Sequence, residues 1–224
     1  MSEFQLPVGF TLTAHTGCMG TKANTIESID AGFNSGADVI EIDIRFLKNG
    51  VPVLSHNPVS KDRENSVVKL DAAFDCIKNY PEKKVNLDIK STENLGEVQR
   101  LAKEKGVLNQ VFFTGIYPNF VNAVRRDAPE ISYYLNYNIP NPLMKVKAYL
   151  NYLVRKTKRL GAVGLNINKA VCSRELVELF HRSNLLVSVW TITDINGAKK
   201  YLSLSPDNIT CKNPDEVARL LGRN

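Results

Sequence analysis

Residues 36–56 read Gly36-Ala-Asp-Val-Ile-Glu41-Ile-Asp43-Ile-Arg-Phe-Leu-Lys-Asn49-Gly50-Val-Pro-Val-Leu-Ser-His56, and no other segment constrains the fold as tightly. Two apolar runs with strand character flank Asn49-Gly50, the strongest short-range signal for a two-residue type I′ turn. We therefore predict an antiparallel hairpin across this segment.

The register of that hairpin indicates which polar groups share a face. With Asn49 and Gly50 as the loop, Asp43 lies opposite His56, and directly opposed residues have Cβ atoms roughly 5 Å apart. Glu41 precedes Asp43 by two residues and so points to the same side of the strand. We predict that both carboxylates and His56 lie on one face.

Strand-like and helix-like patterns alternate along the rest of the chain. The strand-like runs are Thr11–His15, Val39–Arg45, Val51–His56, Val85–Lys90, Val111–Gly115, Ile131–Leu135, Ala162–Asn166, Leu185–Thr191 and Asn208–Cys211. The helical patterns are Thr25–Ser35, Leu95–Lys105, Pro118–Ala128, Leu143–Leu160, Ser173–Ser183, Ile195–Leu202 and Pro214–Leu221.

This alternation predicts an α/β fold with a parallel sheet. Without the antiparallel return of the hairpin, eight strands remain, which favours a closed (β/α)₈ TIM barrel with a hairpin return after its second strand. A doubly wound open sheet is the alternative. It is disfavoured because His15-Thr-Gly17-Cys-Met-Gly20, after the first strand, lacks the glycine order of a dinucleotide-binding loop.

The composition fits one globular domain over residues 1–224. The chain is 43% hydrophobic and 23% charged, and no linker or low-complexity tract interrupts it. It has no apolar stretch near 18 residues and no leader pattern, so we expect a soluble, cytoplasmic protein. The four cysteines are widely spaced and are interpreted as free thiols rather than disulfides or a zinc site.

The net charge of +6 does not by itself indicate a nucleic-acid partner. The basic residues are dispersed and no aromatic-interleaved basic motif occurs, so we expect none. The densest basic stretch, 145–159, has two interpretations. It could make weak contact with a membrane surface, or it could be the solvated face of a packed amphipathic helix, which we favour. The oligomeric state is left open.

Residues that can transfer protons or bind a metal ion follow the strand-like runs or end them. His15 and His56 come just after strand-like runs and can transfer protons near neutral pH. Asp88 and Lys90 are two residues apart and share a face. Strand ends gather at one rim of a barrel, so we predict a site for Mg²⁺ or Ca²⁺, which prefer oxygen ligands. Its carboxylates would be Glu41, Asp43 and Asp88. Lys90 either meets a phosphate oxygen or pairs with Asp88.

These residues resemble a known family. Thr13-Ala-His15-Thr-Gly17, Asn24-Thr25, Gly36–Asp43 and Asn49–Asn57 are similar to the opening of glycerophosphodiester phosphodiesterases. Asn86-Leu-Asp88-Ile-Lys90, Val187-Ser-Val-Trp190-Thr191 and Ile209-Thr210-Cys-Lys-Asn213-Pro214 resemble later family motifs at lower density.

The resemblance implies a TIM barrel that uses a divalent cation to hydrolyse small glycerophosphodiesters to glycerol 3-phosphate and an alcohol. It implies that Glu41, Asp43 and Asp88 hold the metal, that His15 and His56 are the acid and base, and that Lys90 binds phosphate. The nucleophile is either water or the substrate's own glycerol hydroxyl. Trp190 either lines the alcohol pocket or is plain packing.

The sequence departs from the family after the first histidine. The family usually has a phosphate-binding Arg where this chain has Thr16, and a hydroxyl does not replace a guanidinium. We hypothesise that Lys22 or Lys212 supplies the missing positive charge. Two alternative functions stay open: a phosphodiesterase of shifted specificity, for example for lysophospholipids, and a catalytically silent barrel that binds phosphorylated ligands.

Overall fold

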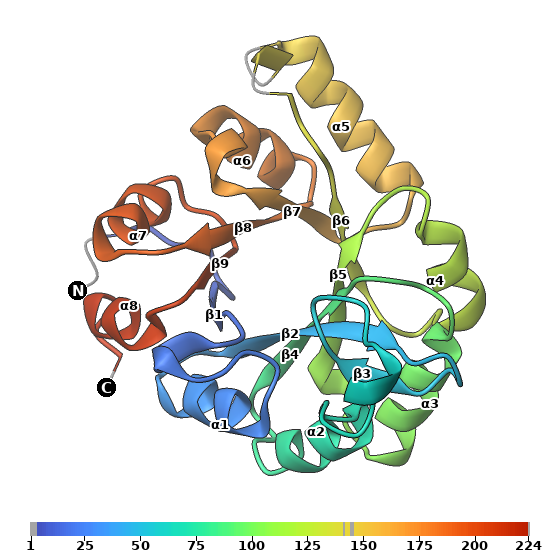
Figure 1. The fold of residues 1–224 in the computed structure, drawn as a ribbon. Coiled ribbons are helices and arrows are strands. Elements are labelled where there is room, and N and C mark those ends of the chain that lie inside the picture. The colour runs from blue at the N-terminus through green and yellow to red at the C-terminus, as the bar shows by residue number, and fades with distance from the viewer. Residues whose placement is uncertain (1–3, 141, 144–145, 224) are drawn as a thin grey trace.

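The computed structural model describes residues 4–140, 142–143 and 146–223. Within them, eight parallel strands form a closed barrel surrounded by helices (Figure 1). In spatial order around the barrel, the strands are β1 (Thr11–Ala14), β9 (Asn208–Cys211), β8 (Leu186–Ile192), β7 (Gly164–Asn168), β6 (Tyr133–Asn136), β5 (Val111–Ile116), β4 (Lys84–Ile89) and β2 (Val39–Phe46).

Pairing between β1 and β2 closes the barrel, with Thr13 beside Val39 and Ala14 beside Ile40. The closure confirms the predicted TIM barrel and rules out the open doubly wound sheet. The helices are α1 (Ile26–Asn34), α2 (Leu70–Ile77), α3 (Leu95–Glu104), α4 (Val121–Asp127), α5 (Lys147–Arg159), α6 (Arg174–Arg182), α7 (Ile195–Leu202) and α8 (Pro214–Leu220).

Helix α2 was not predicted. It is only eight residues long and begins after Lys69, which offers no side-chain cap, so no start signal marks it. Leu70, Ala73, Phe74 and Ile77 nevertheless follow helical spacing and are buried. Their burial against the barrel explains why this short segment is helical.

The predicted hairpin is present, but its predicted register is wrong by one residue. Strand β3 (Pro52–Leu54) runs antiparallel to β2, with Leu54 opposite Ile44. A two-residue loop at Asn49 and Gly50 would instead have set Leu54 opposite Arg45. The Leu47 carbonyl accepts from Gly50 N at 2.8 Å, and Leu47 N donates to the Val51 carbonyl at 2.9 Å. The loop therefore has three residues and ends at Gly50, whose φ of 81° suits the glycine that closes such a turn.

The shifted register changes what faces Asp43. The Asp43 carbonyl accepts a hydrogen bond from Ser55 N at 3.0 Å, so Ser55, not His56, is its neighbour across the hairpin. His56 lies beyond the end of β3 and reaches the site from a loop.

Strand β2 shows how the barrel separates apolar from polar side chains. Ile40, Ile42 and Ile44 are fully buried in the apolar core, while Glu41 and Asp43 alternate with them. Because successive side chains of a strand point to opposite faces, the isoleucines pack under the helices and the carboxylates point into the barrel.

Helix α5 agrees with the packed-helix interpretation of the basic stretch. It buries Leu150, Leu153, Val154 and Thr157, and its basic residues are mostly exposed. Lys145, where the predicted surface begins, lies outside the described residues, as does part of the predicted helical start. No helix among the described residues is long and apolar enough to cross a membrane. The cytoplasmic location stays a prediction.

Candidate active site

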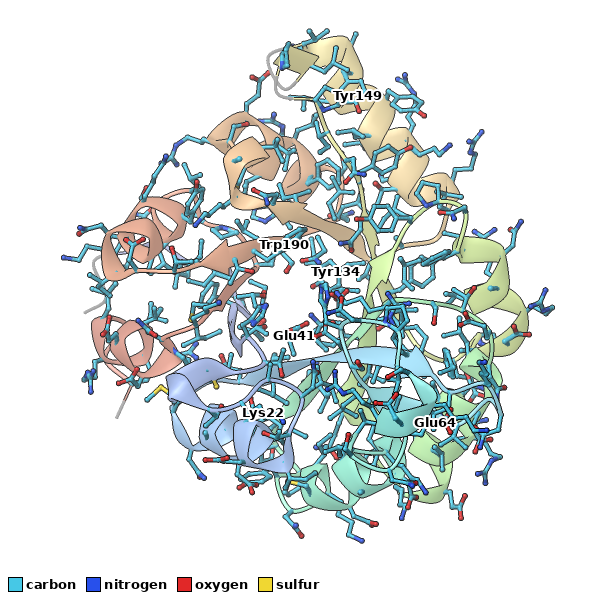
Figure 2. The ribbon with its side chains drawn as sticks, viewed as in Figure 1. Lys22, Glu41, Glu64, Tyr134, Tyr149 and Trp190 are labelled. Atoms are coloured by element: carbon cyan, nitrogen blue, oxygen red, sulfur yellow. The ribbon has the colours of Figure 1, made fainter. Side chains whose placement is uncertain are left out.

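A cavity of about 410 Å³ opens among the carboxyl ends of the barrel strands. Its lining includes seven of the predicted site residues: His15, Glu41, Asp43, His56, Asp88, Lys90 and Trp190. Figure 2 shows Glu41 and Trp190 on opposite sides of the barrel interior. Catalytic groups collect at this end of TIM barrels, and we call this space the main cavity.

Neighbouring strands bring the three carboxylates together. Asp43 of β2 and Asp88 of β4 are paired residues of the parallel ladder, and Glu41 lies two residues before Asp43. One oxygen from each of these residues lies within 4.8 Å of the others. Glu41 and Asp43 are only 5% and 4% exposed, so their charges have little help from water.

Burial is the main reason why the pKa of Glu41 lies well above its ordinary value, and the nearby charges of Asp43 and Asp88 raise it further. Two groups oppose this shift. Thr16 N donates to Glu41 Oε2 at 3.1 Å, and the Lys90 ammonium lies nearby. The cluster therefore has an excess of negative charge that a cation would neutralise.

Lys90 provides part of that neutralisation. Its Nζ lies 2.9 Å from Asp43 Oδ1 and 2.5 Å from Asp88 Oδ2. Burial lowers the pKa of Lys90, but the carboxylates of Asp88 and Asp43 outweigh burial and raise it. The predicted pairing with Asp88 is thus present, and it extends to a second acid.

His15 is oriented by the backbone that follows it. Its Nδ1 lies 2.6 Å from the Thr16 carbonyl oxygen, which only accepts hydrogen bonds, so Nδ1 carries the proton. Nε2 therefore presents a lone pair, and it lies 3.9 Å from Glu41 Oε2. Burial lowers the pKa of His15, and the Lys212 charge acts in the same direction, although the hydrogen bond to the Thr16 carbonyl and the charges of Asp43 and Asp88 oppose them. The ring suits proton acceptance.

His56 is more exposed than His15 and stands on the loop after β3. Its Nδ1 lies 3.2 Å from Asn57 Oδ1, and its carbonyl accepts from Arg45 Nε at 3.0 Å. These contacts fix the loop from which the ring reaches the cavity.

Asn24 was not assigned a role from sequence, yet it holds Asp43 at two points. Its Nδ2 donates to Asp43 Oδ2 at 2.8 Å, and its Oδ1 accepts from Asp43 N at 3.0 Å. Its own backbone N donates to Thr16 Oγ1 at 2.6 Å. The left-handed φ of 61° at Asn24, uncommon outside glycine, permits this arrangement.

Sequence reasoning also missed a polar layer inside the barrel. Asn86, Thr114, Asn136, Asn166 and Thr210 are buried and line the main cavity. Thr114 Oγ1 donates to Asn86 Oδ1 at 2.7 Å and contacts Asp88 Oδ1 at 3.1 Å. The available signal was asparagine within apolar strands, where this residue is uncommon.

Three predicted residues do not line the main cavity. Thr16 is buried, and its hydroxyl accepts the hydrogen bond from Asn24. Lys22 and Lys212 are exposed, and Lys212 lies close enough to His15 to lower its pKa. Their part in phosphate binding stays a prediction.

The donor set fits a hard divalent cation. Mg²⁺ and Ca²⁺ take oxygen ligands, and Glu41, Asp43 and Asp88 offer three carboxylates in mutual reach. A positively charged group, the Lys90 ammonium, already contacts two of them. The residues present are therefore suited to such an ion, although they do not select between the two metals.

A protein-family model matches most of the chain. The model of the glycerophosphoryl diester phosphodiesterase family matches residues 15–68 and 59–216.

Solved structures share the fold at low identity. A glycerophosphodiester phosphodiesterase from Thermotoga maritima is 18% identical, with a TM-score of 0.73 over 94% of this chain and 98% of that one. One from Parabacteroides distasonis is 16% identical, with a TM-score of 0.75 over 95% and 96%. An Oleispira antarctica phosphodiesterase, in complex with its product sn-glycerol-3-phosphate, is 19% identical, with a TM-score of 0.73 over 97% of both chains.

Because the family model spans most of the chain, including the barrel strands that carry the acidic cluster, this protein belongs to the glycerophosphoryl diester phosphodiesterase family.

Proposed function

We propose that the protein hydrolyses small glycerophosphodiesters to glycerol 3-phosphate and an alcohol, using Mg²⁺ or Ca²⁺. The observation that carries this proposal is the opening of two histidines and three clustered carboxylates into one cavity. The Oleispira antarctica relative, whose structure contains sn-glycerol-3-phosphate, supports the product.

Glu41, Asp43 and Asp88 would hold the cation, which when bound neutralises charge on the phosphoryl oxygens. The lone pair on His15 Nε2 suits this residue to accept a proton from the attacking water or glycerol hydroxyl, and His56 would protonate the departing alkoxide. Because Lys90 lies against Asp43 and Asp88, its ammonium would lie beside a phosphate bound at these carboxylates.

Lys212, rather than Lys22, would supply the positive charge towards phosphate that the family usually takes from an Arg after the first histidine. The positive charge of Lys212 lowers the pKa of His15. For Lys22, the only side-chain hydrogen bond in the described chain is the one that its backbone carbonyl accepts from the Thr25 hydroxyl. Trp190, on the rim formed by β8, would contact the alcohol. A phosphodiester KM that stays constant in Lys212→Ala would remove Lys212 from this role.

The test is an assay with glycerophosphocholine, glycerophosphoethanolamine and bis(p-nitrophenyl) phosphate, each with Mg²⁺, Ca²⁺ or EDTA. We expect metal-dependent release of glycerol 3-phosphate, and losses of about 10²–10⁴-fold in kcat for His15→Ala and for His56→Ala.

The third histidine provides the control. His181 of α6 pairs with Asp207 at 2.8 Å and is not among the residues that line the main cavity. His181→Gln should keep the activity of the parent protein. Activity that survives EDTA or both active-site substitutions contradicts the mechanism. Ligand binding without turnover under every metal condition would favour the silent barrel.

A further inference from the structure

A second cavity, of about 560 Å³, adjoins the main one. Tyr117, Asn136 and Trp190 line both, so the two spaces adjoin at these residues. The second cavity extends over the ends of β6 and β7, where Asn138 and Asn168 contribute to its wall. A substrate whose phosphate lies at the carboxylates could therefore extend one of its two alcohol groups into this space.

The boundary between the cavities carries hydrogen-bond donors without protein partners. Asn136 is 5% exposed, and its Oδ1 accepts from Gly115 N at 2.9 Å and from Asn166 Nδ2 at 3.4 Å. Within the described chain, Asn136 Nδ2 has no hydrogen-bond partner. Trp190 Nε1 is buried and likewise unpartnered there. A buried N–H group is strongly favoured to find an acceptor, so a ligand oxygen that reaches Trp190 Nε1 would satisfy the one buried side-chain donor that lacks a partner in the described chain.

The wall of the second cavity is uncharged. Its described lining consists of asparagine amides, aromatic rings and small apolar groups, with no Asp, Glu, Lys, Arg or His. Asn168 Oδ1 accepts from Ala170 N at 2.9 Å, which leaves its amide N–H groups available to a ligand. The amide donors and acceptors of this wall can form hydrogen bonds with the hydroxyl groups of a ligand.

The helix beside this wall, α5, is basic. Helix α5 carries five Lys or Arg residues and no Asp or Glu, and its Tyr152 interacts with Tyr137, a residue of the wall. The Arg159 charge also reaches Tyr137, where it lowers the pKa against the raising effect of burial. A cationic group in the second cavity would meet this positive field without a carboxylate in the described wall to offset it.

We propose that the second cavity binds the leaving alcohol and selects an uncharged polyol, such as glycerol or inositol, over choline or ethanolamine. This inference rests on the proposed function. A polyol supplies oxygen acceptors for the donors at the boundary and hydroxyl groups for the asparagine amides. A quaternary ammonium supplies no hydrogen-bonding atom beyond the ester oxygen, and a primary ammonium adds only donors and a positive charge.

The test compares kcat/KM for glycerophosphoglycerol and glycerophosphoinositol with kcat/KM for glycerophosphocholine and glycerophosphoethanolamine. We expect the polyol diesters to be preferred by roughly tenfold, the effect of a few net hydrogen bonds. Equal or better turnover of the cationic diesters overturns the inference and leaves the proposed function intact. Hydrolysis of none of the four overturns both.

Two substitutions connect the preference to the cavity. Asn138→Asp places a carboxylate in the exposed wall and should shift the polyol-to-choline ratio about threefold towards choline. Trp190→Phe keeps an aromatic ring and removes Nε1–H, so it should lower kcat/KM for polyol diesters more than for glycerophosphocholine.

Asn109→Asp is the matched control. Asn109 is equally an exposed asparagine, but it lies in the turn that leads into β5, at the opposite end of the barrel. The same change of charge there should leave the ratio unchanged. A ratio that responds to neither Asn138→Asp nor Trp190→Phe, or responds as strongly to Asn109→Asp, contradicts the proposal.

Discussion

Asn24 and Asp43 are joined by two hydrogen bonds, one to the carboxylate at 2.8 Å and one from the backbone N at 3.0 Å. The pair fixes both the position of the Asp43 backbone and the direction of its carboxylate. Since one Asp43 oxygen belongs to the acidic cluster, Asn24 acts on the candidate metal site from outside it, as residues that orient metal ligands do.

Replacing Asn24 with Gly should weaken the binding of Mg²⁺ or Ca²⁺ by roughly 10–100-fold. Glycine tolerates the left-handed φ of 61°, so the substitution removes the side chain without new backbone strain. Isothermal titration with the metal alone measures the effect. Asn184→Gly is the control, because Asn184 has a similar φ of 55° at the end of α6. Equal affinities in both variants would remove Asn24 from the metal site.

The sequence predicted the acidic cluster because period-two alternation fixes which strand residues share a face. Glu41, Asp43 and Asp88 follow that rule on neighbouring strands, and the register that pairs Asp43 with Asp88 completes it. The hairpin register was wrong for a local reason. An Asn-Gly dipeptide is compatible with two-residue and three-residue loops, and here the loop includes Lys48 and ends with Gly50 in a left-handed conformation.

Asn24 and Asn136 could not be placed in the same way. Asn24 reaches Asp43 from a loop 19 residues earlier in the chain, and no periodicity connects a loop to a strand. Asn136 meets Gly115 of β5 only because the barrel sets β6 against β5. The second cavity likewise arises from tertiary packing around the ends of β6 and β7, which no local pattern encodes.

Gly115 is positioned so that a side chain would displace Asp88, a candidate metal ligand. A Cβ at this residue would lie 2.5 Å from Asp88 Oδ1 and would also overlap the Ile89 carbonyl oxygen. Gly115→Ala should therefore reduce both metal affinity and unfolding free energy. Gly106→Ala is the control, because Gly106 has the same φ of +71° and open space around it. The control should lose only about 1–2 kcal/mol of unfolding free energy, from backbone strain, which urea denaturation measures. Equal losses in both variants would contradict the steric argument.

Lys90→Gln should lower kcat/KM for a phosphodiester by roughly 10–100-fold, the effect of a lost hydrogen bond to a charged group. The control is Lys105→Gln. The Lys105 side chain is 20% exposed, against 19% for Lys90, and it also bridges two aspartates, Asp71 and Asp75, but outside both cavities. Steady-state kinetics should show normal turnover for Lys105→Gln. A similar loss of kcat/KM in both variants would mean that the effect is general destabilisation.

The raised pKa of Glu41 makes the stability of the metal-free protein depend on pH. Burial, followed by the charges of Asp43 and Asp88, raises this pKa above the ordinary value of 4.5. The folded state therefore holds a proton that the unfolded state has released, and the unfolding free energy contributed by Glu41 falls as pH rises from about 4.5 through the raised pKa.

Denaturation in EDTA from pH 4 to pH 8 should show a smaller fall for Glu41→Gln than for the parent protein. Subtracting the two curves of unfolding free energy against pH removes the contribution of His15. The lowered pKa of His15 makes the unfolding free energy rise with pH, which is opposite to the effect of Glu41. With Mg²⁺ or Ca²⁺ the parent curve should flatten or reverse, because metal binding requires the deprotonated carboxylate and strengthens as pH rises. Parallel curves for the two proteins in EDTA would show that Glu41 titrates normally in the folded state.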